Sequence, residues 1–136
     1  MLDRRHALAA LAAAALTISG LTVSTLPALA LDKTAFSQAA FDAAMKAGKP
    51  VLIDVSAPWC PTCKAQAPIL SELTKQPRFK NLVVFNVDFD SQKDALRGFK
   101  AQQQSTLIVF KGGAEMGRSV GDTNKASIEA LLARAI

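Results

Sequence analysis

The sequence predicts an α/β fold, a central mixed sheet of about four strands flanked by helices, which follows a cleavable signal peptide. Two β-branched apolar runs, at residues 51–57 and 81–89, are each followed by a helical segment, as in the β-α-β units of a parallel sheet. Two further apolar runs around Gly112-Gly113 have the pattern of an antiparallel hairpin. With 136 residues, half of them hydrophobic, the chain is long enough for one compact domain.

The first thirty residues have the features of an export signal. Arg4 and Arg5 form a positive region, residues 7–26 are apolar and uncharged, and Ala28-Leu29-Ala30 is a small-x-small cleavage site. The expected division is therefore a signal peptide at 1–30 and one domain at 31–136, in a periplasmic or otherwise secreted protein. An uncleaved membrane anchor is the alternative, because about 20 apolar residues can span a bilayer. The arginine pair also resembles a twin-arginine signal, so the export route stays open.

The expected elements follow in order along the domain. Apolar residues at helical spacing predict an amphipathic helix over 34–47 that Gly48 stops, and Pro50 precedes the strand at 51–57. The next helix, over 60–75, contains Pro68, which removes one backbone hydrogen bond and should kink it. The remaining elements are a strand at 81–89, a helix at 91–103, strands at 105–110 and 115–120, and a last helix capped by Asp122 or Thr123.

The two cysteines of the chain, Cys60 and Cys63, predict one redox couple. At the start of a helix, Cys60 would meet unpaired backbone N–H groups and the positive end of the helix dipole, which favour a thiolate. Cys63 lies one turn further on and can resolve a mixed disulfide. Pro61 suits the first helical position, and Thr62 adds no charge. A static disulfide is the alternative, although a Cys-x-x-Cys loop stays easily reducible.

No cofactor is expected besides the Cys60–Cys63 disulfide. A structural zinc ion needs four ligands, and the only histidine, His6, lies in the predicted signal. The net charge of +5 comes from bases that are scattered along the chain and not clustered with aromatic residues. The sequence therefore predicts neither a single-chain metal site nor a nucleic-acid site.

Residues 34–136 resemble the thioredoxin superfamily. The resemblance rests on a strand followed by Trp-Cys-x-x-Cys-Lys at 59–64, on Pro68 within the next helix, and on the later strand at 105–110. It implies a thioredoxin fold, with the first edge strand short or missing, and a thiol–disulfide oxidoreductase that acts on protein thiols and disulfides. Two further positions bear on the resemblance: Asp54 matches the superfamily, and Ser105 departs from it.

Asp54 lies in the middle of an apolar strand, where an unpaired carboxylate is expensive to bury. The resemblance implies that Asp54 lies beneath Cys63 and takes up its proton when that thiol becomes the attacking thiolate. The alternative is an aspartate at a strand end that faces solvent. The expected catalytic residues are therefore Cys60, Cys63 and Asp54.

Ser105 departs from the superfamily, which normally has a cis-proline before the residues that match Thr106-Leu107. A cis bond before a non-proline residue costs about 2.5–4 kcal/mol, so the Gln104-Ser105 peptide is expected to be trans. The serine could weaken peptide binding, donate a hydrogen bond to a cysteine sulfur, or make room for a metal or iron–sulfur cluster between two chains. The residues expected to bind substrate are Trp59, Pro61, Thr62, Gln104, Ser105 and Thr106. For Trp59 the alternative is a core aromatic that supports the loop.

These observations favour a monomeric, exported reductant of protein disulfides that receives its electrons from a membrane donor. The pair between the cysteines, Pro61-Thr62, lacks the histidine seen in strongly oxidising relatives, which would stabilise a thiolate further. The alternatives are an oxidase that donates its disulfide, a binding module without turnover, and a dimer that carries a metal or cluster at Ser105.

Overall fold

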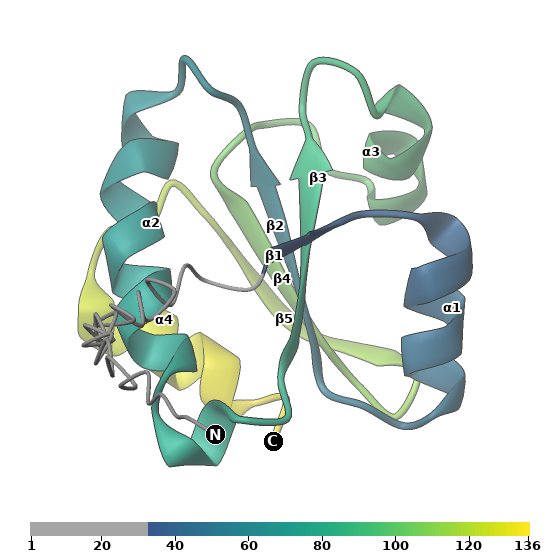
Figure 1. Cartoon of the computed structure of the whole chain (residues 1–136). Helices are drawn as coiled ribbons and strands as arrows, with labels where there is room; N and C mark the ends of the chain where they lie inside the picture. Colours follow the sequence, from purple (N-terminus) through teal and green to yellow (C-terminus); the bar gives the residue numbers. More distant parts are fainter. Residues whose placement is uncertain (1–32) are drawn as a thin grey trace, which may run out of the picture.

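The computed structural model describes residues 33–136, and the predicted signal peptide falls outside them. A five-stranded sheet, in the order β1-β3-β2-β4-β5, forms the centre of the molecule (Figure 1). The elements are β1 (Lys33–Ala35), α1 (Gln38–Lys46), β2 (Val51–Ser56), α2 (Pro61–Thr74), the 3-10 helix η1 (Pro77–Phe79), β3 (Val83–Asp88), α3 (Lys93–Phe99), β4 (Thr106–Lys111), β5 (Ala114–Val120) and α4 (Lys125–Ala133). Strands β1, β2 and β3 run parallel, and β4 and β5 run antiparallel to their neighbours.

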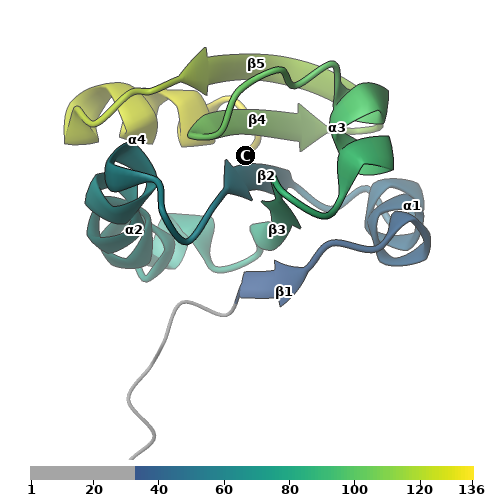
Figure 2. The ribbon, with the colours of Figure 1, turned by 90° about the horizontal axis from the view of Figure 1, so that it is seen from above.

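Helices cover both faces of this sheet, as expected for an α/β fold. Figure 2 shows α1 and α3 on one side and α2 and α4 on the other. The central strand β2 supplies both cores, because successive side chains of a strand point to opposite faces. Val51, Ile53 and Val55 pack with the residues of α1 and α3, whereas Leu52 packs with α2 and α4. The strand that precedes the cysteines is therefore fixed on both sides.

The sheet has one strand more than the four that the sequence predicts. Residues 33–35 pair with β3 as a short edge strand, so α1 begins at Gln38 and not at residue 34. The helix starts there because Ser37 is its N-cap, and its hydroxyl accepts a hydrogen bond from the backbone N–H of Ala40 at 3.2 Å. This short strand brings Lys33 to β3 next to the centre of the sheet.

Two helix boundaries also differ from the expected ones. Helix α3 ends at Phe99, because Lys100 takes the left-handed conformation (φ 52°) that closes helices. Helix α4 is capped by Asn124, whose side chain accepts from the N–H of Ser127 at 3.0 Å, and not by Asp122 or Thr123. The hairpin between β4 and β5 turns at Gly112 and Gly113 as predicted, both with positive φ.

In residues 33–136, none of the helices combines the length and the apolar character that crossing a bilayer requires.

Candidate active site

The cysteine pair lies where β2 gives way to α2. Cys60 is the N-cap of α2, and Pro61 occupies the first turn, as the sequence predicts. Cys60 and Cys63 form a disulfide with a Cα–Cα distance of 5.3 Å. The Cys60 sulfur accepts a hydrogen bond from the backbone N–H of Cys63 at 3.0 Å. The sulfur thus does what a capping oxygen does at other helices: it binds one of the unpaired N–H groups of the first turn.

Both cysteines are buried in the disulfide form, with Cys60 1% and Cys63 8% exposed. They cluster with Ala57, and the partly buried Phe89 packs against them. Exposure therefore does not single out Cys60 as the attacking sulfur. One hydrogen bond distinguishes the two sulfurs: the N–H of Cys63 donates to the Cys60 sulfur, and an N–H group that points at a sulfur stabilises a thiolate there.

Ser105 faces the disulfide from the loop before β4. Its hydroxyl oxygen lies 3.1 Å from the Cys60 sulfur and 3.2 Å from the Cys63 sulfur. The Gln104–Ser105 peptide is trans, as expected, and Ser105 has a φ of 61°, in the left-handed region that non-glycine residues seldom occupy. The structure thus contains the predicted hydrogen bond between the Ser105 hydroxyl and a cysteine sulfur.

Asp54 is buried in the middle of β2, so the alternative of a solvent-facing aspartate is wrong. The residue is 2% exposed and forms an ion pair with Lys33 of β1. By strand alternation Asp54 shares a face with Leu52, which packs against Leu70 and other residues of α2 and α4. The carboxylate therefore points to the side of the sheet on which α2 and Cys63 lie.

Trp59 is 54% exposed, so it is not a core aromatic. Its ring lies edge-to-face on Phe89, with 6.5 Å between centroids, and its N–H donates to Asp90 at 2.9 Å. The loop that carries Phe89 and Asp90 is held by Asp88, whose carboxylate accepts from the N–H and hydroxyl of Ser91, each at 2.7 Å. These hydrogen bonds from Ser91 hold the pKa of Asp88 below its usual value. Phe89 in turn packs against the cysteine cluster.

The other residues expected to bind substrate differ in accessibility. Pro61 is exposed, and Thr62 and Gln104 are half-buried. Pro61 and Thr62 lie between the two cysteines in the chain, and Gln104 directly precedes Ser105. Thr106 is 1% exposed, and its hydroxyl donates to the carbonyl of Gln103 at 2.7 Å. The Thr106 side chain thus stabilises the loop from within and does not face a partner.

Sequence reasoning missed two polar residues of the site. Gln66 is 1% exposed, and its amide donates to the carbonyl of Ser105 at 3.3 Å and to that of Asp122 at 2.7 Å. Its signal was a polar residue at a core position of α2, three residues after Cys63. Lys33 had no such signal, because its contact with Asp54 depends on the order of the strands. Strand β1, which carries Lys33, pairs with β3, and β3 pairs with β2, which carries Asp54.

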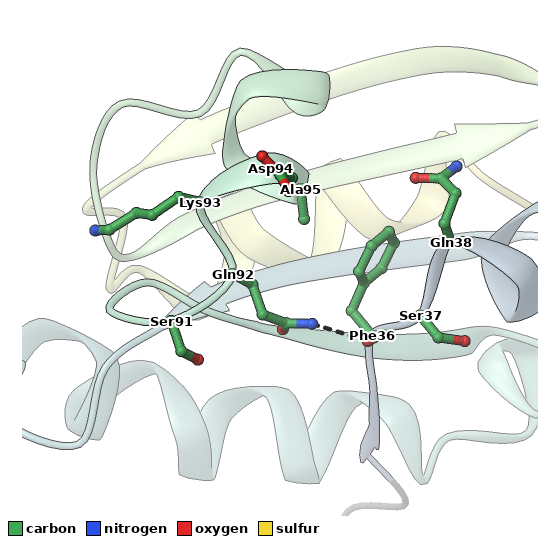
Figure 3. A pocket seen from close by; sticks show the side chains of 8 residues that line it. All are labelled: Phe36, Ser37, Gln38, Ser91, Gln92, Lys93, Asp94 and Ala95. Carbon is green, nitrogen blue, oxygen red and sulfur yellow. Dashed lines mark hydrogen bonds between the residues drawn. The ribbon is translucent and has the colours of Figure 1, made fainter.

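A separate hollow of about 520 Å³ lies between the starts of α1 and α3 (Figure 3). Its central polar side chain, Gln92, is already used inside the protein: it donates to the carbonyl of Phe36 and accepts from the N–H of Asp88, both at 2.9 Å. None of the predicted site residues lines this hollow. In the part of the chain that the structure describes, no cluster of three histidine, cysteine or acidic side chains is arranged to hold a metal ion.

Comparisons with known proteins agree with this arrangement. The sequence model of the family described as Thioredoxin matches residues 32–134. A thioredoxin of Mycobacterium tuberculosis (strain ATCC 25618 / H37Rv) is 38% identical over 84 residues, which cover 62% of this chain and 72% of the relative. A thioredoxin of Echinococcus granulosus is 36% identical over 91 residues, 67% of this chain and 82% of the relative.

Solved structures give the same result. Trxlp from Edwardsiella tarda EIB202 is 47% identical, with a TM-score of 0.71, over 72% of this chain and 95% of that one. A thioredoxin of Schistosoma mansoni is 25% identical, with a TM-score of 0.64, over 76% and 96%. With its Cys-x-x-Cys pair at the start of α2, the chain belongs to the thioredoxin family of thiol–disulfide oxidoreductases.

Proposed function

We propose that this protein is an exported reductant of protein disulfides, with Cys60 as the attacking sulfur, Cys63 as the resolving sulfur and Asp54 as the proton acceptor. The observation that carries the proposal is the Cys60 sulfur at the start of α2, which accepts the Cys63 N–H at 3.0 Å. The sulfur lies at the N-terminus of a helix of 14 residues, where the positive end of the helix dipole also favours a thiolate.

The proposed reaction begins with the reduced pair. The Cys60 thiolate attacks one sulfur of the substrate disulfide, so that a Cys60–substrate bond forms and the other substrate sulfur leaves as a thiolate. Cys63 then loses its proton to Asp54 and attacks the Cys60 sulfur. The second substrate thiolate leaves, the Cys60–Cys63 bond forms, and two electrons have passed to the substrate.

The substrate would meet the disulfide at the surface formed by the exposed Trp59 and Pro61 and the half-buried Thr62 and Gln104. Trp59 is suited to this role because its indole is both exposed and fixed, by its edge-to-face contact with Phe89 and by the hydrogen bond of its N–H to Asp90. An aromatic ring held in this way adds apolar contact area without losing much conformational entropy on binding. We propose that the protein acts as a monomer and that the substrates are protein disulfides.

The reduction potential of the Cys60–Cys63 pair tests whether the protein acts as a reductant. Pro61-Thr62 places no histidine beside the Cys60 thiolate, so the reduced form is stabilised only moderately, and the reduction potential is expected near or below about −270 mV. Equilibration against dithiothreitol and glutathione, with free thiols trapped by alkylation, measures this potential. A value near about −120 mV would make the protein an oxidase. Reduction of insulin with turnover is the companion assay, and binding of insulin without turnover would favour a binding module.

Export is proposed from residues 1–30, which lie outside the described residues. Mass spectrometry of the protein from the extracytoplasmic fraction is expected to give an N-terminus at Leu31, after the small-x-small sequence at 28–30. An intact N-terminus in the membrane fraction would instead indicate an anchor.

An exported reductant cannot easily be reduced by a cytoplasmic reductase. We propose that a membrane protein with a dithiol is its electron donor.

A further inference from the structure

The Ser105 hydroxyl lies between the two sulfurs of the redox pair. It is within hydrogen-bond distance of both, at 3.1 Å from Cys60 and 3.2 Å from Cys63, and Ser105 is 3% exposed. A disulfide has no hydrogen to donate, so the hydroxyl is the donor in the oxidised protein. A thiolate is also only an acceptor. The hydroxyl therefore has a sulfur acceptor in both redox states.

The backbone of Ser105 is held on three sides. Its N–H donates to the carbonyl of Val55 at 2.8 Å, and its own carbonyl accepts from the N–H of Gly121 at 2.9 Å. The buried amide of Gln66 donates to the same carbonyl and, at 2.7 Å, to that of Asp122. These contacts maintain a left-handed conformation that is unfavourable for serine, and this conformation accompanies the contact of the hydroxyl with the sulfurs.

We propose that Ser105 is a catalytic residue of the redox centre, whose hydroxyl donates a hydrogen bond to the Cys60 thiolate, and that Gln66 is the residue that positions it. The inference rests on the proposed role of Cys60. The hydrogen bond changes no covalent bond: reduction still takes two electrons from an external dithiol and breaks the Cys60–Cys63 bond. What it changes is the relative free energy of the two states.

The direction of this effect follows from the acceptor. A hydrogen bond to a charged acceptor is about twice as strong as one between neutral groups, so the hydroxyl stabilises the thiolate more than the disulfide. It therefore lowers the pKa of the Cys60 thiol and makes the disulfide easier to reduce. Burial of both groups strengthens the effect, because water competes little for the hydroxyl.

The test compares Ser105→Ala with Ser105→Gly. Both remove the hydroxyl, but glycine also relieves the left-handed strain and alanine retains it. In both variants the pKa of Cys60, from the thiolate absorbance during a pH titration, is expected to rise by about one unit. The equilibrium constant for reduction by glutathione is expected to fall about tenfold, which corresponds to about 30 mV. Thr74→Ala is the matched control, since that hydroxyl donates to the carbonyl of Leu70 within α2.

The role of Gln66 is tested by Gln66→Leu, which removes the two hydrogen bonds from the amide to the carbonyls of Ser105 and Asp122 and puts an apolar side chain in its place. The potential is expected to shift in the same direction as in Ser105→Ala. The double variant Gln66→Leu/Ser105→Ala is expected to match Ser105→Ala alone, because Gln66 acts through the hydroxyl. Additive shifts would overturn the positioning role, since they would show that Gln66 acts independently.

Other outcomes separate this inference from the proposed function. If the wild-type pair is reduced reversibly but both Ser105 variants keep its potential and its Cys60 pKa, the inference on Ser105 is wrong and the proposed function stands. A shift in Ser105→Ala that is absent from Ser105→Gly assigns the effect to backbone strain and overturns the role of the hydroxyl. A wild-type pair that glutathione and dithiothreitol cannot reduce overturns both.

Discussion

The Cys63→Ser variant is expected to accumulate as a mixed disulfide through Cys60 when it meets an oxidised protein substrate, whereas Cys60→Ser is expected to form no such adduct. The reason is that the attack by Cys63 is intramolecular, and its loss leaves only slow release by external thiols. Insulin reduction is expected to fall on the order of 100-fold or more in both variants. Non-reducing electrophoresis, followed by peptide mapping of the adduct, measures the trapped species.

The comparison of the two variants also decides between the sulfurs. Cys60 is 1% and Cys63 8% exposed in the disulfide form, so accessibility alone would favour Cys63. The assignment to Cys60 instead depends on the N–H of Cys63, which donates to the Cys60 sulfur. Adducts that form in Cys60→Ser but not in Cys63→Ser would reverse the two roles. The double variant is the control for adducts that do not involve either sulfur.

The Lys33→Met variant is expected to lower the free energy of unfolding by about 1–3 kcal/mol. Within residues 33–136, Lys33 is the ion-pair partner of Asp54, and the Asp54 side chain is only 3% exposed. Removing the cation leaves a buried carboxylate uncompensated, which is costlier than losing an ion pair at the surface. This expected loss of stability is smaller than that for a fully buried ion pair, because the Lys33 side chain is 24% exposed. Urea denaturation of the oxidised protein measures the difference.

A double-mutant cycle isolates this interaction. Lys33→Met/Asp54→Asn is expected to recover much of the stability lost in Lys33→Met, because the neutral amide no longer leaves a buried charge. Lys33→Arg keeps the cation and serves as the control. A Lys33→Met protein as stable as the wild type would show that the ion pair contributes nothing to stability.

The Asp54→Asn variant of the same cycle also tests the proposed proton acceptor. With the fold intact, it is expected to slow the resolution step about tenfold or more near neutral pH, because the amide cannot take up the Cys63 proton. Stopped-flow measurement of disulfide exchange checks this result, and unchanged kinetics would remove Asp54 from the mechanism. Asp94→Asn is a suitable control, since the Asp94 side chain is 95% exposed on α3.

Much of the fold could be predicted because its signals are local. The apolar runs of β2 and β3 and the Gly112-Gly113 turn depend on neighbouring residues in the chain, and each forms at the predicted place. The boundaries of α1, α3 and α4 were less accurate. Residues 33–35 pair with β3 and do not start α1, Lys100 closes α3 in a left-handed conformation, and Asn124 caps α4 in place of the neighbouring Asp122 or Thr123.

The sequence by itself indicated the redox pair: the spacing of Cys60 and Cys63, with Pro61 at the first turn, predicts a short disulfide at a helix start, which the structure contains. Only the tertiary structure decided what surrounds it. Lys33 reaches Asp54 across 21 residues of chain, and Ser105 reaches the sulfurs of Cys60 and Cys63 across 45 and 42 residues. Such contacts depend on the register of strand pairing and on packing of both sheet faces, and side-chain patterns along one segment do not specify which distant residues these bring together.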